Sequence, residues 1–141
     1  MREGARFEAG AERPLRLKAH EPADLSVIAA LTQDAVFPVT EMAWDRARRR
    51  FSILLNRFRW EDNPEAGQRE RDFERVQSVL SVEDVMAVKS QGIDRTDREL
   101  VLSLLTLEFK ASEDGAGRIE LTRAGDGAIA LDVEAREVTL R

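Results

Sequence analysis

Residues 51–61 read FSILLNRFRWE, and this stretch decides the fold class. In an extended strand successive side chains point to opposite faces, so odd-numbered and even-numbered residues lie on separate faces. Both faces carry large apolar residues, which predicts a central strand covered on both sides for much of its length. The stretch ends in amide, charged and aromatic side chains, so its end is the first place to look for a site.

The residues before this strand predict one helix near the N-terminus. Pro22 suits the first helical turn, and Asp24 places a negative charge at the positive end of the helix dipole. Apolar residues then recur at helical spacing, so we expect an amphipathic helix over about residues 23–33. Residues 15–18 alternate as a short strand. Residues 36–44 are β-prone but contain Pro38, which is compatible only with an edge or irregular strand.

The residues after it predict further strands in an order that suits hairpins. Residues 76–82 and 85–90 are both strand-like, and either one bulged strand or a hairpin over residues 73–90 fits the break at Glu83-Asp84. Residues 99–110 are apolar on both faces; their composition allows a helix, but their neighbours favour a central strand. Residues 118–123 and 128–133 alternate cleanly around a glycine-containing turn, which is the strongest hairpin signal in the chain.

These elements amount to about seven strands and one helix. We therefore expect an α+β fold, with a strongly bent antiparallel sheet or small split barrel and one N-terminal helix. A pleckstrin-homology-like split barrel is one concrete form of this fold. Residues 138–140 break the strand parity, so we expect the chain to bend or leave the sheet there. Residues 1–13 have little to bury and predict a flexible tail, which leaves residues 14–141 as a single domain.

The composition excludes several kinds of chemistry. The chain has no cysteine, so disulfides, thiolate metal sites and cysteine nucleophiles are excluded, and His20 is its one histidine. No phosphate loop or dinucleotide fingerprint is present. The net charge of −5 argues against a nucleic-acid ligand. No apolar run is long enough to cross a membrane, and the N-terminus lacks the apolar core of a signal peptide, so we expect a cytoplasmic protein without a cofactor or membrane contact.

The strand end at residues 56–61 is the main candidate for a binding site. Asn56 and Arg57 could recognise an anionic or amide group, with Trp60 as a stacking surface and Glu61 as a carboxylate partner. The alternative is structural: Arg57 and Arg59 pair with carboxylates on neighbouring strands, while the aromatic residues belong to the core. Both interpretations require an acidic partner, because an unpaired buried guanidinium is strongly destabilising.

A second cluster, residues 46–50, holds four arginines next to aromatic residues. Sites for single-stranded nucleic acid use this combination. However, residues 61–74 bring six carboxylates against two arginines and would neutralise much of the positive field if they lie nearby. We therefore interpret residues 46–50 as a solvated charged turn.

Several segments together resemble one known family. They are residues 31–36 (LTQDAV), 50–51, 55–61 (LNRFRWE), 74–76, 85–93 (VMAVKSQGI) and 102–105. In these segments the chain resembles domain-of-unknown-function family 2948, which occurs mainly in alphaproteobacteria, and the resemblance runs from about residue 15 to the C-terminus. The family implies no activity. It does imply that Gln33, Asp34, Asn56, Arg57 and Glu61 belong to one shared polar feature, functional or structural.

We expect a non-enzymatic cytosolic binding or protein-interaction module, because no nucleophile, metal set or phosphate loop stands out and neither a catalytic residue nor a metal ligand can be named. Its partner would be another protein or a small anionic ligand, and the oligomeric state stays open. The alternative is a small enzyme or small-anion-binding protein that uses Asp34, Arg57 and Glu61 in a pocket. The expected ligand-binding residues are Asn56, Arg57, Arg59, Trp60, Glu61, Gln33 and Asp34.

Overall fold

The structure is a computed structural model that describes residues 17–19, 21–58, 75–94, 96–124 and 127–141. The described residues form ten strands, one α-helix and one short 3₁₀ helix, and the fold class is α+β. In chain order the elements are β1 (Leu17–Ala19), α2 (Pro22–Thr32), β2 (Val36–Pro38), the 3₁₀ helix η1 (Val39–Glu41), β3 (Met42–Asp45), β4 (Arg50–Phe58), β5 (Arg75–Val82), β6 (Val85–Gln91), β7 (Val101–Ala111), β8 (Gly117–Arg123), β9 (Ala128–Val133) and β10 (Val138–Leu140).

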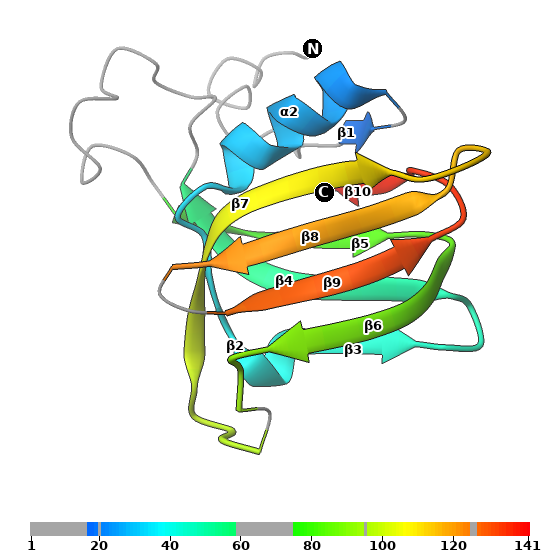
Figure 1. The fold of residues 1–141 in the computed structure, drawn as a ribbon. Coiled ribbons are helices and arrows are strands. Elements are labelled where there is room, and N and C mark those ends of the chain that lie inside the picture. The colour runs from blue at the N-terminus through cyan, green and yellow to red at the C-terminus, as the bar shows by residue number, and fades with distance from the viewer. Residues whose placement is uncertain (1–16, 20, 59–74, 95, 125–126) are drawn as a thin grey trace, which may run out of the picture.

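All strand pairs in the described residues are antiparallel, in the order β1-β10-β5-β4-β2-β7-β8-β9-β6, with β3 paired to β4 beside this path. The path ends at β1 and β6, and the sheet is neither closed nor strongly curled. The expected strongly bent sheet, small split barrel or pleckstrin-homology-like barrel is therefore wrong, since β1 and β6 never pair to close the path. Figure 1 shows β6, β8, β9 and most of β7 as a front layer, with β3, β4, β5 and β10 behind it.

Strand β7 takes part in both layers. Its first residues pair with β2, for example Leu102 with Phe37, and its later residues pair with β8, for example Leu107 with Leu121. The strand passes from β2 to β8 between Ser103 and Leu104, and a register shift against β8 follows between Leu104 and Thr106. Leu102 and Leu104 before the shift and Leu107 after it are buried, so the shift moves the buried side chains from even to odd positions. The prediction of a strand rather than a helix is confirmed.

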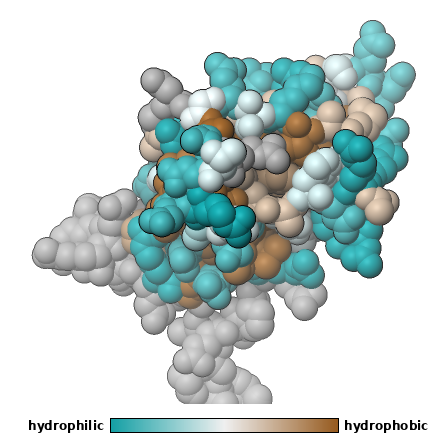
Figure 2. Space-filling view, turned by 90° about the horizontal axis from the view of Figure 1, so that it is seen from below, coloured by the Kyte–Doolittle hydropathy of each residue, from teal (hydrophilic) through white to brown (hydrophobic). Residues whose placement is uncertain are grey.

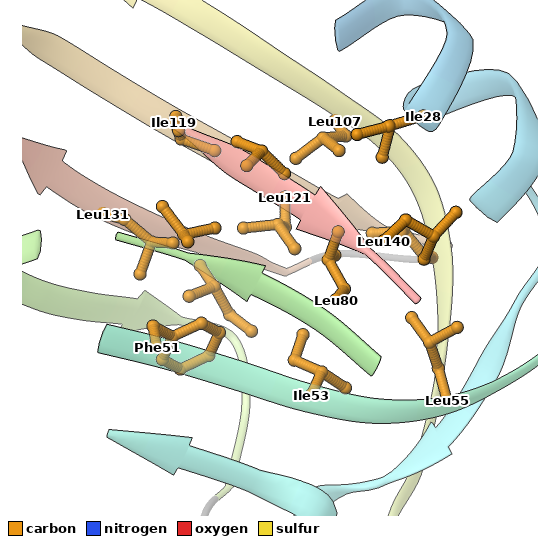
Figure 3. Packing of buried hydrophobic residues seen from close by; sticks show 14 of the residues in the cluster. Ile28, Phe51, Ile53, Leu55, Leu80, Leu107, Ile119, Leu121, Leu131 and Leu140 are labelled. Carbon is orange, nitrogen blue, oxygen red and sulfur yellow. The ribbon is translucent and has the colours of Figure 1, made fainter. Parts of the chain in front are cut away.

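The core lies between the two layers. Figure 3 shows Leu121 of the front layer over Leu80 and Ile53 of the back layer, and Leu131 of the front layer over Phe51. Helix α2 contributes Leu25 and Ile28, which are buried in the same cluster. This helix begins at Pro22 and confirms the predicted N-terminal helix. Burial of these side chains is the main stabilising contribution, because apolar area removed from water supplies most of the free energy of folding.

Strand β4 is central, as predicted, with β5 along one edge and β2 and β3 along the other. Its odd-numbered residues from Phe51 to Arg57 are buried, whereas Ser52, Leu54 and Asn56 are only half buried. The prediction that both faces are covered is therefore wrong for most of the strand. The odd face alone meets the front layer.

The segment over residues 73–90 is neither one bulged strand nor a hairpin. Strand β5 pairs with β4 and β10 in the back layer, whereas β6 pairs with β9 in the front layer. The turn between them places Asp84 at φ 57°, a left-handed conformation that aspartate tolerates. The backbone N–H of Val85 then donates to the carbonyl of Arg49 at 2.9 Å, which fixes the chain as it changes layers.

The C-terminal part follows the predicted order. Strands β8 and β9 form the predicted hairpin, with Thr122 opposite Ala128 next to the turn. The chain then bends out of the front layer, as expected, but residues 138–140 do not leave the sheet: they form β10, which inserts between β5 and β1, where Leu140 pairs with both Leu80 and Leu17. No helix in the described residues is long and apolar enough to cross a membrane. Residues 1–13 lie outside the described residues, so the predicted tail stays a prediction.

Candidate functional site

Asn56 and Arg57 lie next to each other on β4 but point to opposite faces. Asn56 is half buried on the outer face, where its cross-strand neighbours are Val36 and Gln77. Arg57 points into the core and is 1% exposed. Its Nε donates to the Oγ of Ser78 at 2.8 Å, and its Nη1 donates to the carbonyl of Phe58 at 3.0 Å. One ligand therefore cannot contact both side chains from the same side of the sheet.

Gln33 and Asp34 follow helix α2 directly. Gln33 is exposed at the C-cap, and Asp34 is half buried with φ 64°. The backbone N–H of Asp34 donates to the carbonyl of Leu104 at 2.9 Å, so this turn ties the helix end to β7. Arg59, Trp60 and Glu61 lie outside the described residues. The convergence of Asp34, Arg57 and Glu61 in a pocket stays a prediction.

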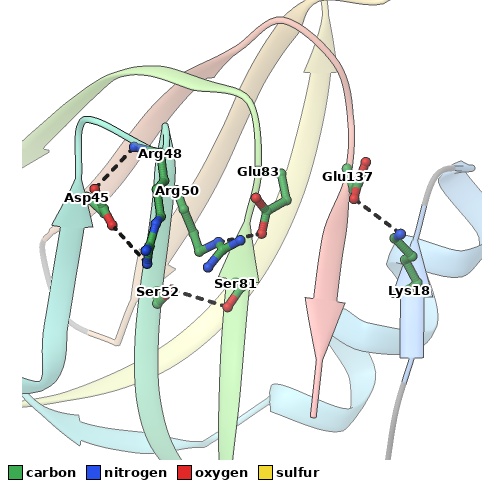
Figure 4. A network of polar contacts seen from close by, with 8 residues as sticks. All are labelled: Lys18, Asp45, Arg48, Arg50, Ser52, Ser81, Glu83 and Glu137. Atoms are coloured by element: carbon green, nitrogen blue, oxygen red, sulfur yellow. Dashed lines mark hydrogen bonds and ion pairs between the residues drawn. The ribbon is translucent and has the colours of Figure 1, made fainter.

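The arginine-rich turn at residues 46–50 is paired with carboxylates at three of its four arginines. Figure 4 shows Arg48 beside Asp45 and Arg50 beside Glu83, with an Nε-to-carboxylate distance of 2.9 Å for the second pair. The side chain of Arg49 pairs with Glu134. Ser52 and Ser81 extend this polar strip across β4 and β5 at 3.2 Å. These pairs support the interpretation of a solvated charged turn.

The described residues form a different cleft at the open end between β3 and β6, which we call the β3–β6 cleft. Its volume is about 250 Å³. Asn56, Arg57, Gln33 and Asp34 do not line this cleft. The cleft is lined by Val39, Thr40, Met42, Trp44, Phe51, Val88, Ser90, Arg98 and Ile129.

Two edge strands supply the walls of the cleft. Met42 and Trp44 are two residues apart on β3, and Val88 and Ser90 are two residues apart on β6, so each pair lies on one face of its strand. Figure 1 shows β6 in front of β3 at the lower end of the molecule. Figure 2 views the molecule from this side and shows brown apolar atoms between teal polar ones.

The interior of the β3–β6 cleft is apolar and its rim is polar. Phe51 and Ile129 form the floor, and each is 3% exposed. Thr40, Ser90 and Arg98 are all exposed at the rim. A ligand that fits this cleft therefore carries an apolar group inward and a polar group outward.

Among the described residues of the lining, Arg98 is the one with a charged side chain, and this side chain forms no hydrogen bond or ion pair with another described residue. Two carboxylates of the same loop are engaged elsewhere. The Oδ1 of Asp94 accepts hydrogen bonds from Thr96 Oγ1 at 2.5 Å and Thr96 N at 3.0 Å, and the Oδ1 of Asp97 accepts one from the backbone N–H of Glu99 at 3.1 Å. These bonds from Thr96 lower the pKa of Asp94 below its usual value. Asp94 and Asp97 do not line the cleft, whereas the guanidinium of Arg98 lies at its rim.

The described residues of the lining carry apolar, hydroxyl and guanidinium side chains, and none of them is a carboxylate or a histidine. Within the described ranges, no group of three or more histidine, cysteine or acidic residues could hold a metal ion. Sequence reasoning missed this cleft because its walls come from separate segments. The one local signal was the alternation of Met42 and Trp44 on an expected edge strand.

Comparison with known proteins gives one family. The family model described as "Protein of unknown function (DUF2948)" matches residues 15–141, nearly the whole chain. Searches of curated proteins and of solved structures returned no match. The resemblance noted in the sequence to domain-of-unknown-function family 2948 is thereby confirmed.

Proposed function

Because the chain belongs to the DUF2948 family of proteins of unknown function, its role must be inferred from its own surface, and we propose that it is a non-enzymatic protein-interaction module. Its contact region is the β3–β6 cleft. One observation carries the proposal: in the part of the chain that the structure describes, the cleft joins a buried apolar floor to a rim with one cation, Arg98, and its lining holds no acid–base pair.

The position of the cleft supports an interaction with another chain. Strand β6 pairs only with β9 and β3 only with β4 among the described strands, so each has one edge without a strand partner. Such edges present backbone N–H and C=O groups that an incoming extended segment can use. A cleft between two such edges can receive a side chain from that segment.

The alternative of a small-anion site or small enzyme at Asp34, Arg57 and Glu61 has less support. Arg57 is 1% exposed and already donates to Ser78 and to the carbonyl of Phe58. An anion would have to displace these contacts to reach the guanidinium. A titration with inorganic phosphate that shifted the Arg57 Nε–H resonance would favour this alternative.

The proposed function is tested by titrating the ¹⁵N-labelled protein with indole and with isobutanol, which imitate apolar side chains. We expect the largest chemical-shift changes at the backbone amides of Val88, Ser90 and Ile129. Ser90→Phe places a ring in the cleft and should abolish these changes. Lys89→Phe places the same ring on the other face of β6, where Lys89 pairs with Asp132, and should leave them intact. Shifts that map away from the cleft, or that survive Ser90→Phe, would overturn the proposal.

A further inference from the structure

We propose that the β3–β6 cleft binds the C-terminal residue of a partner protein. The apolar side chain of that residue fills the cleft, its terminal carboxylate meets Arg98, and the preceding residues add to the free edge of β6. This inference rests on the proposed function and names the chemistry of the ligand.

The size of the cleft points to a single residue. Its volume is about 250 Å³. A cavity of about 150 Å³ holds benzene, and sites for drug-sized ligands begin at roughly 300 Å³. A leucine-sized or phenylalanine-sized side chain fits between these limits, and a longer apolar segment does not.

The charge at the rim points to a carboxylate on that ligand. Among the described residues that line the cleft, Arg98 is the one with a charged side chain, and Asp94, Asp97 and Glu99 of the same loop do not line it. Lys89 lies between Val88 and Ser90 in sequence, but it points to the opposite face of β6 and pairs with Asp132 at 3.5 Å. The charged group that the described lining offers to a ligand is therefore the guanidinium of Arg98.

The alternation of an extended chain decides which carboxylate can reach Arg98. If one side chain of an added strand enters the cleft, the side chains of its two neighbours point to the opposite face. The next residue on the same face lies about 6.6 Å further along the strand. A terminal carboxylate, in contrast, is attached to the Cα of the anchored residue itself. The carboxylate closest to the cleft is thus the C-terminus of the partner.

The free edge of β6 explains why the partner is a peptide and not a free acid. Main-chain pairing along an edge strand contributes affinity, and a pocket for alternate side chains contributes specificity. Residues of β6 that face the cleft are flanked by backbone groups with no strand partner on that side among the described strands. A free acid of the same apolar size could use the cleft and Arg98 but not this edge.

The test uses three probes on the ¹⁵N-labelled full chain: N-acetyl-Thr-Ala-Thr-Phe with a free carboxylate, the same peptide as its C-terminal amide, and N-acetyl-phenylalanine. We expect the free-carboxylate peptide to shift the amides of Val88 and Ser90 and to bind at least about tenfold more tightly than the amide, as charge-assisted hydrogen bonds do. It should also bind more tightly than N-acetyl-phenylalanine. Arg98→Gln should remove the preference for the carboxylate. Arg46→Gln, a matched change at another exposed arginine near Trp44, should retain it.

Each of the other outcomes overturns a named part of the inference. Equal binding of acid and amide would overturn the carboxylate contact. Equal binding of the peptide and N-acetyl-phenylalanine would overturn the added strand and make the ligand a free apolar acid. If none of the probes shifts the cleft amides, the inference fails altogether. The indole titration separates the two proposals. If indole still binds in the cleft, the proposed function survives each of these results. If indole does not bind there, the proposed function fails together with the inference.

Discussion

The Nε of Arg57 donates to the Oγ of Ser78 at 2.8 Å inside the sheet, between two neighbouring strands of the back layer. Both residues are buried. A guanidinium in this position tolerates burial because its donors are satisfied by fixed acceptors, and each acceptor that is removed leaves a charged donor away from water.

Ser78→Ala removes one of these acceptors. We expect it to lower the free energy of unfolding by about 1–3 kcal/mol, measured by urea denaturation. Ser26→Ala is the matched control, because the Oγ of Ser26 is exposed and bonds only the carbonyl of Pro22. This control should stay within about 0.5 kcal/mol of the unmodified protein. If both changes lowered the free energy of unfolding by the same amount, the hydrogen bond from Arg57 to Ser78 would add nothing to stability.

Gly117→Ala should be destabilising for a steric reason. A Cβ atom at this position would lie 2.7 Å from Cζ of Phe109 and also too close to the carbonyl of Lys110. We expect a loss of about 1–3 kcal/mol, because the ring or the backbone of β7 must shift. Gly115→Asn tests the same turn without a clash. Gly115 has φ +82° and open space around it, and asparagine tolerates that conformation, so thermal unfolding should change little.

The contact between the layers can be measured with two leucines. Leu121 points into the core and is fully buried, whereas Leu105 of β7 is 43% exposed. We expect Leu121→Ala to lower the free energy of unfolding by about 2–5 kcal/mol through lost burial and a residual cavity. Leu105→Ala should cost far less. Similar losses at the two positions, measured by chemical denaturation, would contradict the assignment of the core to the space between the layers.

The loop that carries Arg98 should depend on pH through Asp94. Hydrogen bonds from Thr96 lower the pKa of Asp94, so the ionised form holds the loop more firmly than the protonated form does. The contribution is present above the usual pKa of aspartate and is lost as the pH falls through the lowered value. The Thr96 amide resonance should therefore titrate with a midpoint below that of an unstructured aspartate. Asp94→Asn should abolish this titration, and an unchanged profile would show that another group titrates.

Local patterns in the sequence were sufficient for individual elements. Helix α2 and the β8–β9 hairpin follow from helical spacing, from alternation and from the residues at their ends, all of which act between neighbours in the chain. The leucines at odd and even positions of β7 indicated a strand. They did not indicate that its first part pairs with one layer and its second part with the other. That division depends on pairing with β2 and β8, and no local pattern encodes it.

The site was harder to predict than the strands. The sequence drew attention to Asn56 and Arg57 because polar residues end a long apolar strand, yet alternation itself sends these two side chains to opposite faces. The β3–β6 cleft depends on Trp44, Val88 and Arg98, which lie far apart in the chain. Only the change of layer at Asp84 brings β6 opposite β3, and that turn could equally have been a bulge or a hairpin from its residues alone.

The pairing of Leu17 with Leu140 has a consequence for the order of folding. Among the described strands β1 pairs only with β10, and β10 follows all the other described strands in the chain. Until β10 docks, one edge of β5, including Leu80 and Val82, has no strand beside it in the described fold. An open edge of this kind is prone to pairing between chains. A partly folded chain in which β10 has not docked should therefore aggregate more readily than the folded protein.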